Sequence, residues 1–519
     1  MEHDEDPLLH QNDQEESERM TVDEILTKSG PFGKYQLGLL LICMFIFSNS
    51  VSFQSLVTYY TADDPPWKCV DVNISSFCTK GPFQEGTKFF TKRCHLKRNQ
   101  WEYTRPKTYS FTTEFDLVCS KEYLKALSTA LFFIGGMIGA VLSGPLADAY
   151  GRKPVIIGGF FAEFLAALAG YFVTAPWQYL VLRTVIGAGF GALTPTVYIY
   201  LSESNSPKSR GWVGNIYFFG FTFSMMIVSM LAYYVPSWRK LVLYTSAFPL
   251  LSFIGSWFLM ESPHWLSSKE QFGKAEDVLK KMGKFNGKPL KVSLVRNREK
   301  KKSNFSYVHL FNKWRVFVLT SLQCYLWFGI GLVFYAIALE SSNLGGNLYT
   351  NFILSSLADV PGYAITIFMS IYVGRKKVVV AGFSLSCLFL IAIGLTPETY
   401  TMARVGMAIS GRMGATLAFN TLFLWTFEIY PTVVRSKGMN ICQMFSRLGS
   451  AAAPFLTSVL QDIDPKLPYF IMAGFAVAGT ILCLFLPEML GKPTREEYKE
   501  LFDENPTIQV TPPINEDEN

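Results

Sequence analysis

The feature that most constrains this chain is a series of long apolar stretches that carry almost no charge. Windows of about twenty residues contain at most one charged side chain, which matches the ~20 helical residues that cross a hydrocarbon core of ~30 Å. Charged residues make up 17% of the 519 residues, whereas soluble domains average ~25%. A soluble multidomain enzyme would not contain a dozen such stretches. The sequence therefore predicts an all-α, polytopic membrane protein.

Twelve membrane spans are expected, six on each side of a polar central segment. They cover residues 35–57, 125–146, 155–174, 177–201, 212–235, 240–260, 315–339, 347–372, 378–395, 401–427, 440–461 and 468–487. The chain then divides into five regions: a tail (1–34), a first six-helix half (35–260), a central loop (261–313), a second six-helix half (314–487) and a second tail (488–519).

The basic residues indicate which loops face the cytosol. They cluster in short loops at 152–153, 208–210, 375–377 and 435–437 and in the central loop, as the positive-inside rule requires of cytosolic loops. Because the basic residues lie in loops expected in the cytosol, the net charge of +6 does not indicate a nucleic-acid partner. The acidic, polar start of the chain does not resemble a secretory signal, so both tails are expected in the cytosol.

The polar stretch 58–124 is expected on the opposite, extracellular or luminal side. It contains Cys69, Cys78, Cys94 and Cys119 and the acceptor triplet that begins at Asn73. An even number of cysteines and a glycosylation triplet in one loop are typical of an oxidising compartment. Two disulfides are predicted, and the three pairings that four cysteines allow remain open.

Two signatures recur at nearly constant separation along the chain. The pair Glu203 and Arg210 returns as Glu428 and Arg435, an offset of 225 (428 − 203), and the triplet Gly-Arg-Lys at 151–153 returns at 374–376. Glu261 and Glu488 form a looser third pair. This spacing indicates that the two halves are related by duplication.

Several motifs together resemble one family. GPLADAYGRK (144–153) resembles the loop signature of the major facilitator superfamily. The segments MTVDEIL, TEFDLVC, ESPHWL, LGGNLYTNF and FEIYPTVVR are similar to markers of its organic cation, anion and zwitterion transporters. The resemblance covers about residues 20–490 and implies the twelve-helix major facilitator fold and transport of organic ions. Departures from the family pattern are Ala149, His264 and Ile371.

Ionisable residues inside the apolar stretches are candidates for function, because a lone charge in hydrocarbon costs at least ~2.5–3.5 kcal/mol. Asp359 and Arg447 lie in spans of the same half, and we expect both to face a central cavity. The resemblance aligns Asp359 with the substrate-facing acid of the family. An acid together with an arginine suits a zwitterion or a mixed organic ion. Glu163 and Arg183 are interpreted instead as residues that lock helices together.

Aromatic and amide side chains are expected to complete the substrate site. The family's aromatic pattern in the seventh span is matched by Trp327, Phe328, Phe334 and Tyr335. An aromatic face attracts an organic ammonium by ~0.5–2 kcal/mol, and we expect Tyr335 and Phe334 to act in this way. Candidate hydrogen-bonding partners are Asn420 and Gln443, with Asn49 and Gln54 in the first half.

A second group of charged residues lies at the cytosolic ends of the spans and is predicted to gate the transporter. We expect ion pairs among these residues to hold the two halves together while the cavity opens outward, as rocking about a midplane site requires. The group consists of Asp148, Arg152, Glu203, Arg210, Glu428 and Arg435.

The sequence thus predicts a secondary transporter of a small organic cation or a carnitine-like zwitterion. The alternatives are an organic anion transporter, a vesicular or lysosomal carrier of the same fold, and a non-transporting membrane receptor. No HExxH, GxSxG or GxxxxGK[ST] motif occurs, so neither an enzyme nor an ATP-driven pump is expected, and no metal or cofactor is predicted. The plasma membrane is the expected location, with endosomal sorting through Asp4, Leu8 and Leu9 as an alternative.

Overall fold

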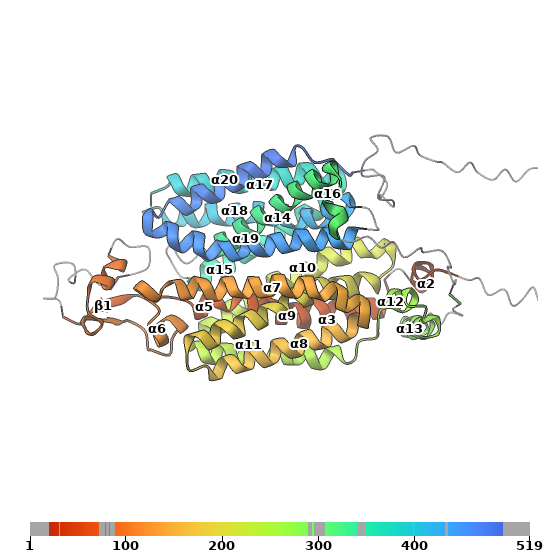
Figure 1. Cartoon of the computed structure of the whole chain (residues 1–519), viewed down its shortest axis with the longest axis horizontal. Coiled ribbons are helices and arrows are strands. Elements are labelled where there is room, and N and C mark those ends of the chain that lie inside the picture. The colour runs from red at the N-terminus through yellow and green to blue at the C-terminus, as the bar shows by residue number, and fades with distance from the viewer. Residues whose placement is uncertain are drawn as a thin grey trace, which may run out of the picture.

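The computed structural model describes residues 20–30, 32–71, 78, 82–83, 89–288, 293–294, 307–340, 348–397, 399–430 and 434–490. Two bundles of long helices lie side by side, with a polar region at each end of the molecule (Figure 1). Asp4, Leu8, Leu9 and Asn73 lie outside the described residues, so the predicted sorting signal and glycosylation site stay predictions.

The first bundle, drawn in orange and yellow in Figure 1, contains the segments expected as spans one to six. The first span is continuous but not uniform, because a π-helical turn, η1 (Cys43–Phe47), interrupts it. Its other parts are α3 (Lys34–Ile42), α4 (Ser48–Leu56) and α5 (Thr58–Thr61). The remaining spans are α7 (Tyr123–Tyr150), α8 (Arg152–Ala169) with the short η7 (Gly170–Phe172), α9 (Pro176–Glu203), α10 (Pro207–Tyr234) and α11 (Trp238–Ser256).

The second bundle, drawn in green and blue, repeats this arrangement. It consists of α14 (Trp314–Glu340), α15 (Leu348–Leu357), α16 (Asp359–Tyr372), α17 (Arg375–Leu395), α18 (Thr401–Ile429), α19 (Arg435–Ile463) and α20 (Leu467–Cys483). The eighth span is divided between α15 and α16. Pro361 explains the break, because proline has no N–H for the helix ladder and its ring clashes with the preceding turn.

Within the described part of the chain, eight helical segments are long and apolar enough to cross a membrane, and Leu467–Cys483 is a shorter apolar helix. Helices α11, α18 and α19 complete the two bundles. The prediction of an all-α membrane protein with twelve spans in two six-helix halves is confirmed. The two halves contact each other along α7 and α19, and where α10 packs against α15 and α16.

One end of the molecule carries the disulfide-containing loop. It contains a two-stranded antiparallel sheet of β1 (Trp67–Cys69) and β2 (Trp101–Tyr103), whose Trp67 and Trp101 pack with Phe83 and Phe90 in an aromatic cluster. Disulfides join Cys69 to Cys78 and Cys94 to Cys119, which decides the pairing that the sequence left open. Short helical turns connect the sheet to the first bundle: η4 (Phe90–His95), η5 (Arg98–Gln100), α6 (Phe111–Phe115) and η6 (Cys119–Lys121).

The opposite end carries three helices that pack together at the end of the first bundle. These are α2 (Val22–Lys28), α12 (Pro263–Ser268) and the amphipathic α13 (Phe272–Phe285). A single turn, η8 (Tyr307–Leu310), precedes the second bundle. We call this the α13 end and the opposite end the disulfide end.

The recurring sequence signatures meet in space in the same way in both halves. Glu261 accepts a hydrogen bond from the backbone N–H of Arg152 at the start of α8, and Glu488 accepts one from Arg375 at the start of α17. Carboxylates at these positions satisfy free N–H groups and favour the positive end of the helix dipole. Gly151 precedes the first of these helices with φ of 109°, and a Cβ there would lie 2.3 Å from Glu261. The duplication is therefore visible in the structure.

Candidate substrate site

A cavity of about 70 Å³ lies between the two halves, near the middle of the long helices. Nine of its 17 lining residues are aromatic, so its wall is mainly apolar and π-rich. The first half contributes residues of α4, α9 and α10, and the second half contributes residues of α14, α16, α18 and α19. A water occupies ~10–15 Å³ of such space. The cavity therefore has room for about five waters.

Arg447 is the charged residue that lines this cavity. Its guanidinium carbon lies 4.1 Å from the ring centroid of Phe190, and the phenol of Tyr335 lies beside it. Its Nε is buried without a hydrogen-bond partner, and the ion pairs found among the described residues do not include it. The cavity therefore contains a cation with an unused hydrogen-bond donor at Nε.

Asp359 does not line the cavity with it. Both oxygens of this carboxylate accept hydrogen bonds from Arg412, from Nε at 3.3 Å and from Nη2 at 3.1 Å. Thr416 donates a third hydrogen bond, and both charged side chains are fully buried. The expectation that Asp359 faces the cavity together with Arg447 is not met in this structure, because its carboxylate pairs with Arg412 outside the cavity lining. A role of Asp359 in substrate binding stays a prediction.

Local structure explains why Asp359 and Arg412 meet. The break between α15 and α16 places Asp359 in the first turn of α16, and Arg412 lies on α18, which packs against α16. The guanidinium of Arg412 also lies 3.9 Å from the ring centroid of Phe334. A buried ion pair is tolerated only when its remaining donors and acceptors are satisfied, and Thr416 and the aromatic face contribute to this.

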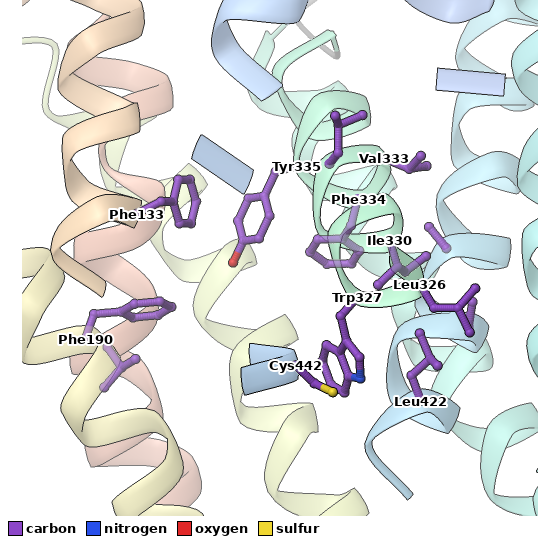
Figure 2. Close-up of a cluster of buried hydrophobic side chains, with 14 of the residues drawn as sticks. Phe133, Phe190, Leu326, Trp327, Ile330, Val333, Phe334, Tyr335, Leu422 and Cys442 are labelled. Carbon is purple, nitrogen blue, oxygen red and sulfur yellow. The ribbon is translucent and has the colours of Figure 1, made fainter. Parts of the chain in front are cut away.

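Four other predicted site residues do line the cavity: Phe334, Tyr335, Asn420 and Gln443. The amide nitrogens of Asn420 and Gln443 are buried without a hydrogen-bond partner among the described residues. They are therefore available to a polar group of a bound molecule. Tyr335 touches the first half, since its ring centroid lies 4.6 Å from that of Phe133 in an edge-to-face arrangement, and Figure 2 shows the two rings next to each other.

The remaining intramembrane candidates have structural partners instead. Glu163 accepts a hydrogen bond from Ser50, and Arg183 donates to the backbone oxygen of Gln54. Both charged residues are buried and lie outside the cavity lining. Asn49, Gln54 and Trp327 are likewise buried outside the cavity lining, and Phe328 is partly buried against the core.

The residues predicted to form the gate make ion pairs within one half. Arg152 pairs with Glu203 at 3.0 Å and with Asp148 at 3.0 Å, and all three belong to the first bundle. In the second bundle Glu428 pairs with Arg375 at 2.7 Å. These ion pairs stay within each half in this structure. Pairs that bridge the halves were expected for the state in which the cavity opens outward, so that expectation stays a prediction.

The two remaining members of the predicted gate have other neighbours. Arg210 contacts Asp23 of α2. Arg435 donates to the backbone oxygen of Tyr430 and lies over the ring of Phe427. A role for the six residues in gating stays a prediction.

Two important residues were missed from the sequence. Arg412 lies within the apolar stretch 401–427, and the rule that marked Asp359 and Arg447 should also have marked it. Phe190 had no such signal, because aromatic residues are 15% of the chain and its contact with Arg447 involves a helix of the other half. Only the packing of the two halves identifies it.

Comparison with known proteins agrees with this architecture. The family described as "Sugar (and other) transporter" matches residues 74–502. Human organic anion transporter 3 is 30% identical, with 96% of each chain covered. Organic cation/carnitine transporter 4 of Arabidopsis thaliana is 28% identical, with 94% of this chain and 93% of that protein covered. Among solved structures, the Escherichia coli xylose transporter XylE, in a partially occluded inward open conformation, superposes with a TM-score of 0.62 at 15% identity. That match covers 88% of this chain and 99% of XylE.

These matches define a class of protein, a multi-pass membrane transporter of the major facilitator fold. Within that class, the chain belongs to the family of organic cation, anion and zwitterion transporters. The prediction of a transporter rather than an enzyme is confirmed.

Proposed function

We propose that this transporter carries small organic ions that bear an anionic group, either organic anions or carnitine-like zwitterions, and that Arg447 binds this group. The observation that carries the proposal is the charge of the cavity. Arg447 contributes a positive charge to the lining, whereas the nearby carboxylate of Asp359 is neutralised by Arg412. A guanidinium presents donors that match a carboxylate in a two-point arrangement.

The aromatic wall supports binding of the rest of the substrate. Phe334, Phe419 and Tyr363 lie on the second half, and Phe218 and Phe221 face them from the first. Aromatic faces accommodate an apolar body by burial and a quaternary ammonium by cation–π attraction. A zwitterion would thus place its carboxylate on Arg447 and its ammonium on the rings. A purely cationic substrate would meet repulsion from Arg447 and no free carboxylate on the cavity wall.

The contacts between the halves at the disulfide end indicate which side of the cavity is closed. At the disulfide end, aromatic residues of the two halves touch each other: Tyr60 stacks on Tyr349 with centroids 5.6 Å apart, and Tyr59 contacts Phe352 at 5.2 Å. We infer that these contacts close the cavity toward the disulfide side, and that the halves rock to open it, as in other transporters with a midplane site.

Uptake in cells that express the chain tests the proposal. The probes are carnitine, glutarate and tetraethylammonium, chosen as a zwitterion, a dianion and a pure cation. We expect saturable uptake of carnitine or glutarate and none of tetraethylammonium. Arg447→Ala at equal surface expression should lower uptake of the transported probe by roughly 30-fold or more, since truncating one partner of a buried charge pair costs ~2–5 kcal/mol.

Lys240→Gln is the matched control, because it also removes a positive charge but from an exposed position. Saturable uptake of tetraethylammonium alone, or full activity of Arg447→Ala, would overturn the assignment. Absence of flux with retained binding of a probe would favour the receptor alternative.

We also propose that the protein resides in the plasma membrane, with its disulfide end outside the cell. The two disulfides at this end support this orientation, because disulfides persist in an oxidising environment such as the outside of the cell. Imaging separates this location from an endosomal one: a Leu8→Ala/Leu9→Ala double variant should leave the distribution unchanged. A shift of the variant from internal membranes to the surface would instead support sorting through the N-terminal tail.

A further inference from the structure

Arg447 is held by a ring that belongs to the other half of the molecule. Its guanidinium carbon lies over Phe190 at 4.1 Å from the ring centroid. Phe190 is on α9 of the first half and Arg447 is on α19 of the second. Both side chains are buried, at 2% and 8% exposure, and both line the cavity. The contact therefore spans the interface at the place where we expect the substrate.

The position of the Phe190 ring is fixed by close packing behind it. The ring contacts Phe132 of α7 with centroids 5.0 Å apart. Glycines allow α7 and α9 to approach this closely: a Cβ on Gly191 would lie 1.8 Å from the backbone oxygen of Gly136. A Cβ on Gly136 itself would lie 3.5 Å from Phe190 and 3.8 Å from Arg447. The ring is thus closely packed against the first half.

The chemistry of the two groups allows a third group to join them. A cation is attracted to the face of an aromatic ring by the ring quadrupole. The N–H groups of a guanidinium point outward in its plane, so contact with a ring face does not consume them. Nε of Arg447 is indeed without a partner. An anionic group can therefore bind the N–H edge of Arg447 while Phe190 remains on its face.

We propose that Phe190 is a positioning residue for substrate binding. Its ring holds the Arg447 guanidinium in the orientation that receives the anionic group of the substrate. Because ring and cation belong to opposite halves, this arrangement exists only while the halves are closed around the cavity. Anion binding and closure of the halves therefore favour each other. The inference rests on the proposed role of Arg447 in anion binding.

Figure 2 shows the setting of this contact. Phe133 and Phe190 project from helices of the first half, and Phe334 and Tyr335 project from α14 toward them. Tyr335 lies beside Arg447 as well. The cation therefore has aromatic neighbours from both halves, and Phe190 is the one whose contact depends on their closure.

The experiment weakens the attraction between the Phe190 ring and the Arg447 guanidinium in steps, by removing electron density from the ring. Phe190 is replaced by phenylalanines with one, two and three fluorine atoms, which weaken the quadrupole but barely change ring size. The KM for the transported probe, carnitine or glutarate, should rise stepwise with each fluorine. Phe190→Leu should raise KM by about 3- to 30-fold, as loss of a desolvated cation–π contact implies, whereas Phe190→Trp should restore the wild-type value or lower it.

Phe160 supplies the control, because it is a buried phenylalanine of the first half that lies outside the cavity lining and makes no contact with a cation among the described residues. The same fluorine series at Phe160 should leave KM unchanged. A flat fluorine series at Phe190, or equal effects at the two positions, would overturn the proposal. This outcome is separable from failure of the proposed function, in which Arg447→Ala itself retains normal uptake.

Discussion

At the scale of single residues, the role of a charged side chain inside the bundles depends on whether it has a partner of opposite charge. Asp359 and Arg412 neutralise each other, whereas Arg447 is left with an aromatic neighbour. Burial of an ion in a medium of low polarity is costly, and a well-arranged partner offsets most of that cost. We therefore propose different roles for these residues: the ion pair joins helices of the second half, and Arg447 binds the substrate.

We expect removal of Arg412 to destabilise the protein strongly. Arg412→Gln leaves the carboxylate of Asp359 buried without a counter-charge, and breaking a buried pair in this way costs ~3–5 kcal/mol. The midpoint of thermal unfolding of the purified protein should fall clearly. The double variant Asp359→Asn/Arg412→Gln should recover much of the loss, since no charge remains. A single variant as stable as wild type would contradict the pairing.

A pH-dependent contribution to stability is expected from Asp63 in the disulfide loop. Burial raises the pKa of Asp63 to about 6, with Asp64 adding to this effect and the Tyr109 hydroxyl and Lys125 opposing it. An unfolded aspartate has a pKa of ~3.9, so the folded protein binds an extra proton between these values. The contribution is present at low pH and is lost as pH rises through about 6.

Thermal unfolding of the purified protein between pH 5 and pH 7.5 measures this effect. The midpoint should fall as the pH rises, and Asp63→Asn should flatten this part of the profile. Asp71→Asn, in the same loop, should leave the slope as it is in wild type. A slope that persists in Asp63→Asn would assign the effect to another group.

At the scale of elements, short helices at the α13 end attach the N-terminal segment to the transporter. Helix α2 is capped by Thr21 and Glu24, which satisfy each other's backbone N–H groups. Its apolar face, with Ile25 fully buried, packs in one cluster with Leu279 of α13. Although partial burial alone would raise the pKa of Asp23, hydrogen bonds and charges from His264 and Arg210 lower it to about 2.

We expect this docking to fail when its apolar contact is removed. Ile25→Ser should expose α2 by loss of a buried side chain worth ~2 kcal/mol or more. Hydrogen exchange of residues Val22–Lys28 should accelerate by at least roughly tenfold, since 1.4 kcal/mol corresponds to that factor. Glu24→Gln keeps the capping geometry and serves as the control. Unchanged exchange in Ile25→Ser would mean that the polar contacts alone hold the helix.

The largest unit is the pair of halves, whose contact differs between the two ends. At the disulfide end, Tyr349 stacks on Tyr60 and touches Tyr233, both on the first half. The charged pairs near the α13 end stay within each half. We therefore infer that contacts between aromatic rings close the disulfide side of the cavity. Loss of one ring should weaken this closure.

Access of a thiol reagent to the cavity tests this closure. In a variant with Ser52→Cys, a cysteine lines the cavity. Adding Tyr349→Ala should increase its labelling by a membrane-impermeant reagent applied from outside intact cells. Tyr400→Ala, an exposed tyrosine elsewhere on the second half, should not. Equal labelling with and without Tyr349 would show that other contacts close this side.

The fold was predictable from the sequence because membrane spans are set by local composition. A run of apolar residues must form a helix in hydrocarbon, since its backbone has no water to bond to. The two halves were also predictable, because the recurring Gly-Arg-Lys and Glu motifs can be recognised in the sequence before any packing is known. The cavity lining was predictable in part: it includes Tyr335, Phe334, Asn420, Gln443 and Arg447, whose role in substrate binding stays a prediction.

The partners of the charges were decided by tertiary structure alone. Asp359 and Arg412 are 53 residues apart in the chain and on different helices, and Phe190 reaches Arg447 from the opposite half. Such contacts depend on helix rotation and crossing, which a hydropathy pattern does not encode. The sequence by itself therefore determined that this is a two-half membrane transporter. Which charge the cavity presents depended on packing, because a buried charge acts on a substrate only when no neighbouring helix neutralises it.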